Sequence, residues 1–175
     1  MSAVDSGKLA LLVFAAVVLQ TSIVSSLDIR GGAPDLVLVL LVCVALLRGA
    51  VVGAAAGFVA GLLVDMGTLQ TLGVTSLLLT VAGYWAGRYG ETTGRDRAHA
   101  PTAAVFTMTV LATVAGYALH FLLGDAVSAR FVFVDTLLPT VVMNVLLAVP
   151  VFALCRRVLP GAQRAECIRE VRLLV

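Results

Sequence analysis

Long apolar tracts separated by short clusters of charge run through the whole chain. Tracts without Asp, Glu, Lys or Arg include 9–27, 49–64, 66–87 and 101–124. A helix needs about 20 mostly apolar residues to cross the hydrocarbon core of a membrane. The pattern therefore predicts six membrane-spanning helices, at about 9–27, 34–47, 49–64, 69–87, 101–123 and 136–155.

The second and third predicted spans are short. Residues 34–47 would rise only about 21 Å as a helix, against about 30 Å of hydrocarbon. We therefore expect 34–47 and 49–64 to form a tilted helical hairpin with Arg48 at its tip. The alternative is one continuous helix over 34–64, which gives five spans. It would bury Arg48 in mid-membrane, at a cost of at least about 2.5–3.5 kcal/mol.

Glycine recurs at every fourth residue of the third predicted span, at Gly49, Gly53, Gly57 and Gly61, and Asp65 continues the series. A step of four residues advances about 40° around a helix, so neighbouring glycines share a slowly drifting face. Over the whole series the drift reaches roughly 160°. We expect Gly53, Gly57 and Gly61 to face one packed helix, because small residues allow close approach in membranes. The sequence leaves open whether that helix belongs to the same chain.

The composition places the chain among membrane proteins. Of its 175 residues, 61% are hydrophobic and 13% are charged, whereas a soluble domain carries about 25% charged residues. We predict an all-α polytopic membrane protein with one transmembrane domain, residues 1–160. The tail, 161–175, is either an amphipathic helix on the inner surface or solvated chain. The first apolar run exceeds the roughly 7–15 residues of a signal peptide, so we interpret it as a retained span.

The basic residues indicate an orientation. With six spans and a cytoplasmic N-terminus, ten of the twelve Lys and Arg residues lie inside, and only Arg30 and Arg130 lie outside. This matches the positive-inside rule. We expect a multi-pass protein of the bacterial inner membrane with both termini in the cytoplasm.

Polar residues within or beside the apolar tracts are the candidate site residues. Asp35 follows Pro34 in the first turn of the second span, where an acid suits the positive end of the helix dipole. Asp35 could cap the helix, or it could act as a conformational latch or a partner contact. Arg48 is expected to anchor the inner turn, and Asp65 lies at an outer helix end. Asn144, in the middle of the last span, is expected to clasp a neighbouring helix.

The sequence carries no recognisable catalytic set. His99 and His120 are separated by the fifth span, and Asp35 and Asp65 are the only acidic pair that an intramembrane hydrolase could use. No spacing fits a metal or cofactor site, and we expect neither. The cysteines, which we interpret as small packing residues, are Cys43, Cys155 and Cys167.

Several of these residues together resemble a known family, the rod shape-determining membrane protein MreD. The resemblance is densest over 34–88 and covers most of the chain. It is carried by Pro34-Asp35-Leu36, by Ala45-Leu46-Leu47-Arg48-Gly49, by Gly53, Gly57, Gly61 and Asp65, and by Gly73, Gly83-Tyr84 and Gly87-Arg88.

The resemblance implies a non-enzymatic subunit of the bacterial cell-elongation machinery, which controls cell shape and peptidoglycan synthesis. It implies binding to the bitopic protein MreC and, through it, links to MreB filaments, the RodA glycosyltransferase and a class B penicillin-binding protein. The implied fold is similar to the substrate-binding subunits of energy-coupling-factor transporters. Pro34, Asp35, Arg48 and Asp65 would be structural or interface positions. The protein would contact membrane lipid, and we expect no nucleic acid among its partners.

Three functions remain in competition. A scaffold would pack MreC along Gly53, Gly57 and Gly61, which together form the glycine stripe. Gly57→Leu or Gly61→Leu would then weaken co-purification with MreC. A substrate-binding subunit of a vitamin-type transporter would need an outward pocket lined by aromatic and hydrogen-bonding groups. An intramembrane enzyme would lose turnover on Asp35→Asn or Asp65→Asn.

Overall fold

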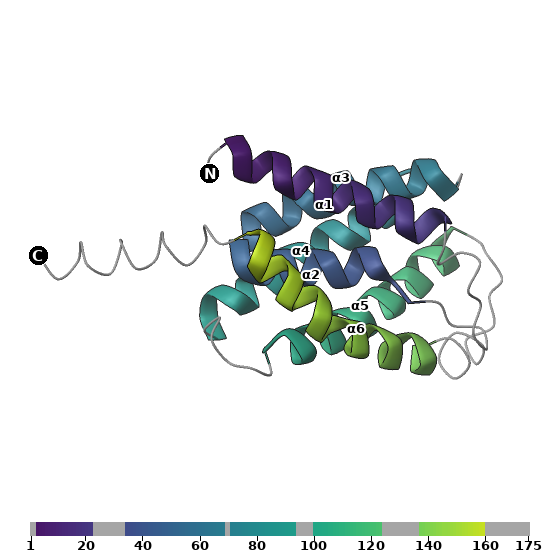
Figure 1. The fold of residues 1–175 in the computed structure, drawn as a ribbon. Coiled ribbons are helices and arrows are strands. Elements are labelled where there is room, and N and C mark those ends of the chain that lie inside the picture. The colour runs from purple at the N-terminus through teal and green to yellow at the C-terminus, as the bar shows by residue number, and fades with distance from the viewer. Residues whose placement is uncertain (1–2, 23–33, 69–70, 94–99, 124–136, 160–175) are drawn as a thin grey trace, which may run out of the picture.

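The computed structural model describes residues 3–22, 34–68, 71–93, 100–123 and 137–159. Six helices make up the regular structure of these residues (Figure 1). They are α1 (Ala3–Ser22), α2 (Leu36–Arg48), α3 (Ala50–Thr68), α4 (Val74–Thr93), α5 (Ala100–Leu122) and α6 (Leu137–Val158). The all-helical architecture predicted from the sequence is confirmed.

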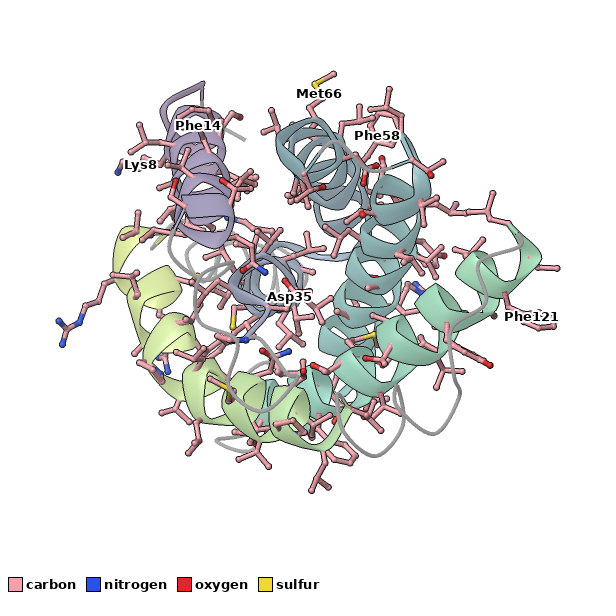
Figure 2. All side chains as sticks on the ribbon, turned by 90° about the vertical axis from the view of Figure 1, so that its right-hand side faces the viewer. Lys8, Phe14, Asp35, Phe58, Met66 and Phe121 are labelled. Atoms are coloured by element: carbon pink, nitrogen blue, oxygen red, sulfur yellow. The ribbon has the colours of Figure 1, made fainter. Side chains whose placement is uncertain are left out.

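The helices form a bundle around α2. Successive helices run in alternating directions (Figure 1), and a view along the bundle shows α2 in the middle with the other five around it (Figure 2). Each of these five helices contacts α2. The chain thus places its second helix, and not its longest ones, at the centre.

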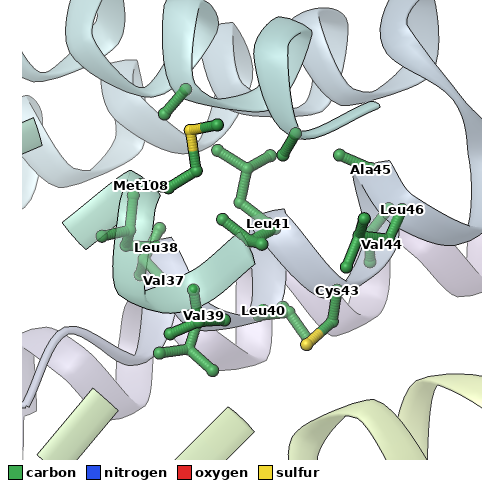
Figure 3. Packing of buried hydrophobic residues seen from close by; sticks show 14 of the residues in the cluster. Val37, Leu38, Val39, Leu40, Leu41, Cys43, Val44, Ala45, Leu46 and Met108 are labelled. Carbon is green, nitrogen blue, oxygen red and sulfur yellow. The ribbon is translucent and has the colours of Figure 1, made fainter. Parts of the chain in front are cut away.

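The composition of α2 suits this central position. All residues from Val37 to Leu47 are buried, and all are Leu, Val, Ala or Cys. A helix that is apolar on every side can be buried on every side, and Figure 3 shows its side chains packed with Met108 of α5 and other neighbours. Lipid is as apolar as these side chains, so close packing, and not escape from water, must hold α2 in place within a membrane.

Gly49 separates α2 from α3. Its φ of 91° is a conformation that side-chain-bearing residues rarely adopt, and its N–H donates a 2.7 Å hydrogen bond to the carbonyl of Ala45. The next helix begins at once with Ala50, and the chain reverses direction there (Figure 1). This matches the expected hairpin with Arg48 at its tip, and a continuous helix over 34–64 is not formed.

Several helix boundaries differ from the predicted spans: α1 begins at Ala3 and not at 9, and α6 ends at Val158 and not at 155. The third span was predicted to stop at residue 64, but α3 continues to Thr68, because the carboxylate of Asp65 finds a hydrogen-bond donor inside the protein. The fourth was predicted over 69–87, but α4 runs from Val74 to Thr93. Residues 23–27 of the first predicted span and the tail 161–175 lie outside the described residues.

The lengths of the helices only partly support the six predicted spans. Among the described residues, three helices are long and apolar enough to cross a membrane by length and composition. They are Ala50–Thr68, Pro101–Leu119 within α5, and Leu137–Val158. The apolar part of α1, Ser6–Ser22, and the whole of α2 are shorter.

Candidate functional site

The N–H groups at the N-terminus of α2 donate hydrogen bonds to three side chains, one from α6, one from α1 and one from the residue just before α2. The first N–H groups of a helix have no partner within it. Here the N–H of Asp35 donates to Oδ1 of Asn144 (2.8 Å), that of Leu36 to Oε1 of Gln20 (2.8 Å), and that of Leu38 to Oδ1 of Asp35 itself (2.9 Å). Asp35 is therefore the N-cap, and Pro34 lies just before the helix and not in its first turn as predicted.

Asn144 connects this helix start to two further elements. It lies in α6 and is fully buried, and its Nδ2 donates to Oγ1 of Thr109 in α5 (3.2 Å). Its side chain thus bonds α2 and α5 at the same time. The expectation that Asn144 clasps neighbouring helices is confirmed.

The start of α3 is capped by a residue that was not among the predicted site residues, Glu91. Glu91, in the last turns of α4, accepts a hydrogen bond from the N–H of Ala50 (2.9 Å) and forms an ion pair with Arg88 (3.3 Å). Arg48 precedes Ala50 by two residues in this turn, and its Nε and Nη2 atoms are buried. A carboxylate at a helix N-terminus is favourable both as an acceptor and through the helix dipole.

The glycine stripe of α3 lies against the backbone of α4. A Cβ atom added to Gly53 would meet the carbonyl of Gly83, one added to Gly57 would meet that of Leu79, and one added to Gly61 would meet the Cα of Ser76. All three glycines are buried. The facing helix is therefore part of the same chain, and α4 runs antiparallel to α3.

Glycines of α4 continue this close contact toward the turn at Gly49. A Cβ added to Gly87 would meet the Cα of Ala50, and one added to Gly90 would lie 2.8 Å from the carbonyl oxygen of Leu46 in α2. The contact thus extends along nearly all of α3. A helix of another protein could reach the glycine stripe only by displacing α4, so the expected packing of MreC along it does not fit this arrangement.

Asp65 caps α4 as Glu91 caps α3. Its side chain is 1% exposed, and its Oδ2 accepts a 2.7 Å hydrogen bond from the N–H of Gly73, the residue before α4. Gly73 has a φ of 97°, which suits glycine. Each helix of the α3–α4 pair therefore supplies an acid to the start of the other.

Asp35 and Asp65 thus have separate tasks. Each carboxylate accepts a backbone N–H at the start of a different helix, α2 for Asp35 and α4 for Asp65. In the part of the chain that the structure describes, no three His, Cys, Asp or Glu side chains lie close enough to hold a metal ion. The geometry of these polar groups is that of helix caps.

An apolar groove lies between α1 and α3, with a volume of about 410 Å³. Its lining includes Leu9 and Val13 from α1 and Val59 and Leu63 from α3. A second, smaller hollow of about 130 Å³ lies between α4 and α5 and is also lined by aliphatic side chains.

These observations define the class of protein. Helix ends are buried in an apolar bundle and are satisfied by side chains in place of water, which is the solution that a bilayer imposes on a folded chain. Three helices have the length and composition of membrane spans.

A family model for the rod shape-determining protein MreD matches residues 7–158, and the chain belongs to this family. Together with the apolar helices, this membership indicates an integral membrane protein with a role in rod-shape determination. Comparisons with curated proteins and with solved structures give no match, so the expected likeness to energy-coupling-factor subunits stays a prediction.

The glycine contact predicts that Gly57→Ala destabilises the fold. The added methyl group would meet the backbone of Leu79, which cannot rotate away, and overpacking of this kind costs about 1–3 kcal/mol. Thermal unfolding of the purified protein in detergent should show a lower midpoint. Gly7→Ala is the matched control, since nothing lies within 4 Å of the Cβ position at Gly7. Equal midpoints for the two variants would contradict the assigned contact.

The capping geometry predicts different effects for two changes at Asp35. Asp35→Asn keeps an oxygen that accepts the N–H of Leu38, so its stability should stay close to that of the native protein. Asp35→Ala removes the acceptor and should cost about 0.5–2 kcal/mol. Chemical or thermal unfolding in detergent measures both. If Asp35→Asn were as harmful as Asp35→Ala, the negative charge, and not the cap, would be the important property.

Proposed function

We propose that all six helices lie across the bacterial inner membrane. The N-terminal end of α1 and the C-terminal ends of α2, α4 and α6 then lie on the cytoplasmic side. The described Lys and Arg residues support this orientation. All five belong to those helix ends, which Figure 1 places at one end of the bundle: Lys8, Arg48, Arg88, Arg156 and Arg157. The two capping acids at the opposite end are Asp35 and Asp65. This distribution follows the positive-inside rule.

The short length of α2 does not argue against six spans. Thirteen residues rise about 20 Å, less than the hydrocarbon thickness. The other five helices surround α2, so its ends need not reach the membrane surface. Its N-terminus is instead satisfied by Gln20, Asn144 and Asp35.

Within this frame, the protein is a non-enzymatic scaffold of the rod complex. It binds MreC and helps to control cell shape and peptidoglycan synthesis, with MreB, RodA and a class B penicillin-binding protein as indirect partners. Family membership is the observation that carries this function. The site adds a physical argument: the side chains of Asn144, Glu91 and Asp65 bond one helix to another, and Asp35 caps the start of its own helix. A rigid bundle of this kind suits a protein that presents a constant surface to its partners.

The proposed orientation predicts which positions a membrane-impermeant thiol reagent reaches in intact cells. In a background in which Cys43, Cys155 and Cys167 are replaced by Ser or Ala, we expect a cysteine at Leu72 or Leu122 to be labelled from outside. A cysteine at Arg157 should react only after the cells are opened. Leu72, Leu122 and Arg157 are all exposed side chains at helix ends or beside them. The reverse labelling pattern would overturn the orientation and leave the fold intact.

The proposed scaffold function predicts rescue of cell shape. Rod-shaped bacteria depleted of their own MreD should regain a constant cell width when they express this chain together with its own MreC, and the two proteins should co-purify. Gly57→Leu, which breaks the α3–α4 contact, should fail in both assays, and Gly7→Ala should succeed in both. A native chain that inserts into the membrane and does not retain MreC would argue against the scaffold.

A further inference from the structure

The C-terminal end of α1 is attached to two neighbouring helices. Oε1 of Gln20 accepts a 2.8 Å hydrogen bond from the N–H of Leu36, at the start of α2. One residue further along, Thr21 lies against α3, since a Cβ added to Gly67 would lie 3.1 Å from its Cγ2 atom. A hydrogen bond and a close contact therefore hold this end of α1 to both α2 and α3.

The packing of α1 changes at Val13. Val13 and Val17 are both buried, whereas no residue of the stretch 6–12 is buried. Leu11, in that stretch, is 71% exposed, and nothing lies within 4 Å of the Cβ position at Gly7. The N-terminal half of α1 is thus packed much less closely than its C-terminal half.

The groove of about 410 Å³ lies beside this loosely packed half. It separates residues 6–14 of α1 from residues 55–63 of α3, and its lining is apolar apart from Ser6. In lipid the hydrophobic effect does not press two helices together, so they are held by close packing and hydrogen bonds. The groove interrupts that packing, and the N-terminal half of α1 has little to keep it at one distance from α3.

We infer that α1 is an arm that pivots about its C-terminal contacts, so that its N-terminal half closes and opens the groove. The helix contains no proline and moves as one rod. It rises roughly 21 Å from Ser6 to Gln20, so a tilt of about 10° moves Ser6 by roughly 4 Å. Tilts of about 20° are ordinary for membrane helices. Closure brings the apolar walls of the groove, among them Leu9 and Val59, toward each other.

The wall that α3 contributes is the fixed one. Asp65 of α3 bonds the start of α4, and Glu91 of α4 bonds the start of α3, so both ends of that pair are tied. The width of the groove is therefore set by α1. The arm gives the surface of α1 and α3 an open and a closed form, and it does not depend on the proposed orientation.

Distances between pairs of spin labels test the pivot. The full chain, with Cys43, Cys155 and Cys167 replaced by Ser or Ala, would be reconstituted in phospholipid vesicles and measured by pulsed electron–electron double resonance. The labels are attached to cysteines at exposed positions, so the core is undisturbed. The pairs are Leu11→Cys with Val51→Cys across the N-terminal half of α1, Leu19→Cys with Met66→Cys near its C-terminal contacts, and Val51→Cys with Trp85→Cys across α3 and α4.

We expect the distance distribution of the pair at positions 11 and 51 to be about two-fold wider than those of the other two pairs. A narrow distribution at positions 51 and 85 assigns the excess width to α1 and not to α3. Equal widths for all three pairs, or a wide distribution between α3 and α4, would overturn the pivoting arm.

A change at the pivot gives a second test. Gln20→Ala removes the acceptor of the Leu36 N–H and loosens the C-terminal end of α1. The distribution for positions 19 and 66 should then become as wide as that for positions 11 and 51. An unchanged distribution at positions 19 and 66 would show that Gln20 does not hold the pivot and would refute its place in the mechanism.

Discussion

The backbone N–H groups at the start of α2 impose the main constraint on this protein. This end is surrounded by other helices, and an unsatisfied polar group in such a place costs several kcal/mol. Gln20 from α1, Asn144 from α6 and Asp35 supply the missing acceptors, and Asn144 is held in turn by Thr109 of α5. The central helix can therefore exist only where three of its neighbours take fixed positions.

A second constraint is the distance between α3 and α4. Glycine at Gly53 and Gly57 allows the backbones to approach until no side chain fits between them. Such close packing provides the dispersion energy that holds helices together in lipid. Asp65 and Glu91 then fix the two ends of the pair. The stability of the α3–α4 pair depends on close fit and hydrogen bonding, because the lipid that would otherwise cover these helix surfaces is apolar as well.

Much of this organisation could be predicted from the sequence. The features that could not be predicted were missed for physical reasons. The register of Gly53, Gly57 and Gly61 predicted a close helix contact, and an amide at Asn144 within an apolar span predicted a clasp. The central position of α2 was missed because an all-apolar helix looks the same whether lipid or protein surrounds it. Glu91 was missed because a charge close to Arg88, near the end of a predicted span, has the pattern of a simple membrane anchor. The groove depends on the separation of α1 and α3, which no pattern in either helix encodes.

The exchange of caps between α3 and α4 also determines how the protein can move. Sliding one helix past the other by a single turn, about 5.4 Å, would pull Asp65 from Gly73 and Glu91 from Ala50 together. The two caps therefore oppose a sliding motion of α3 against α4, and a change of shape elsewhere in the bundle can leave this pair intact.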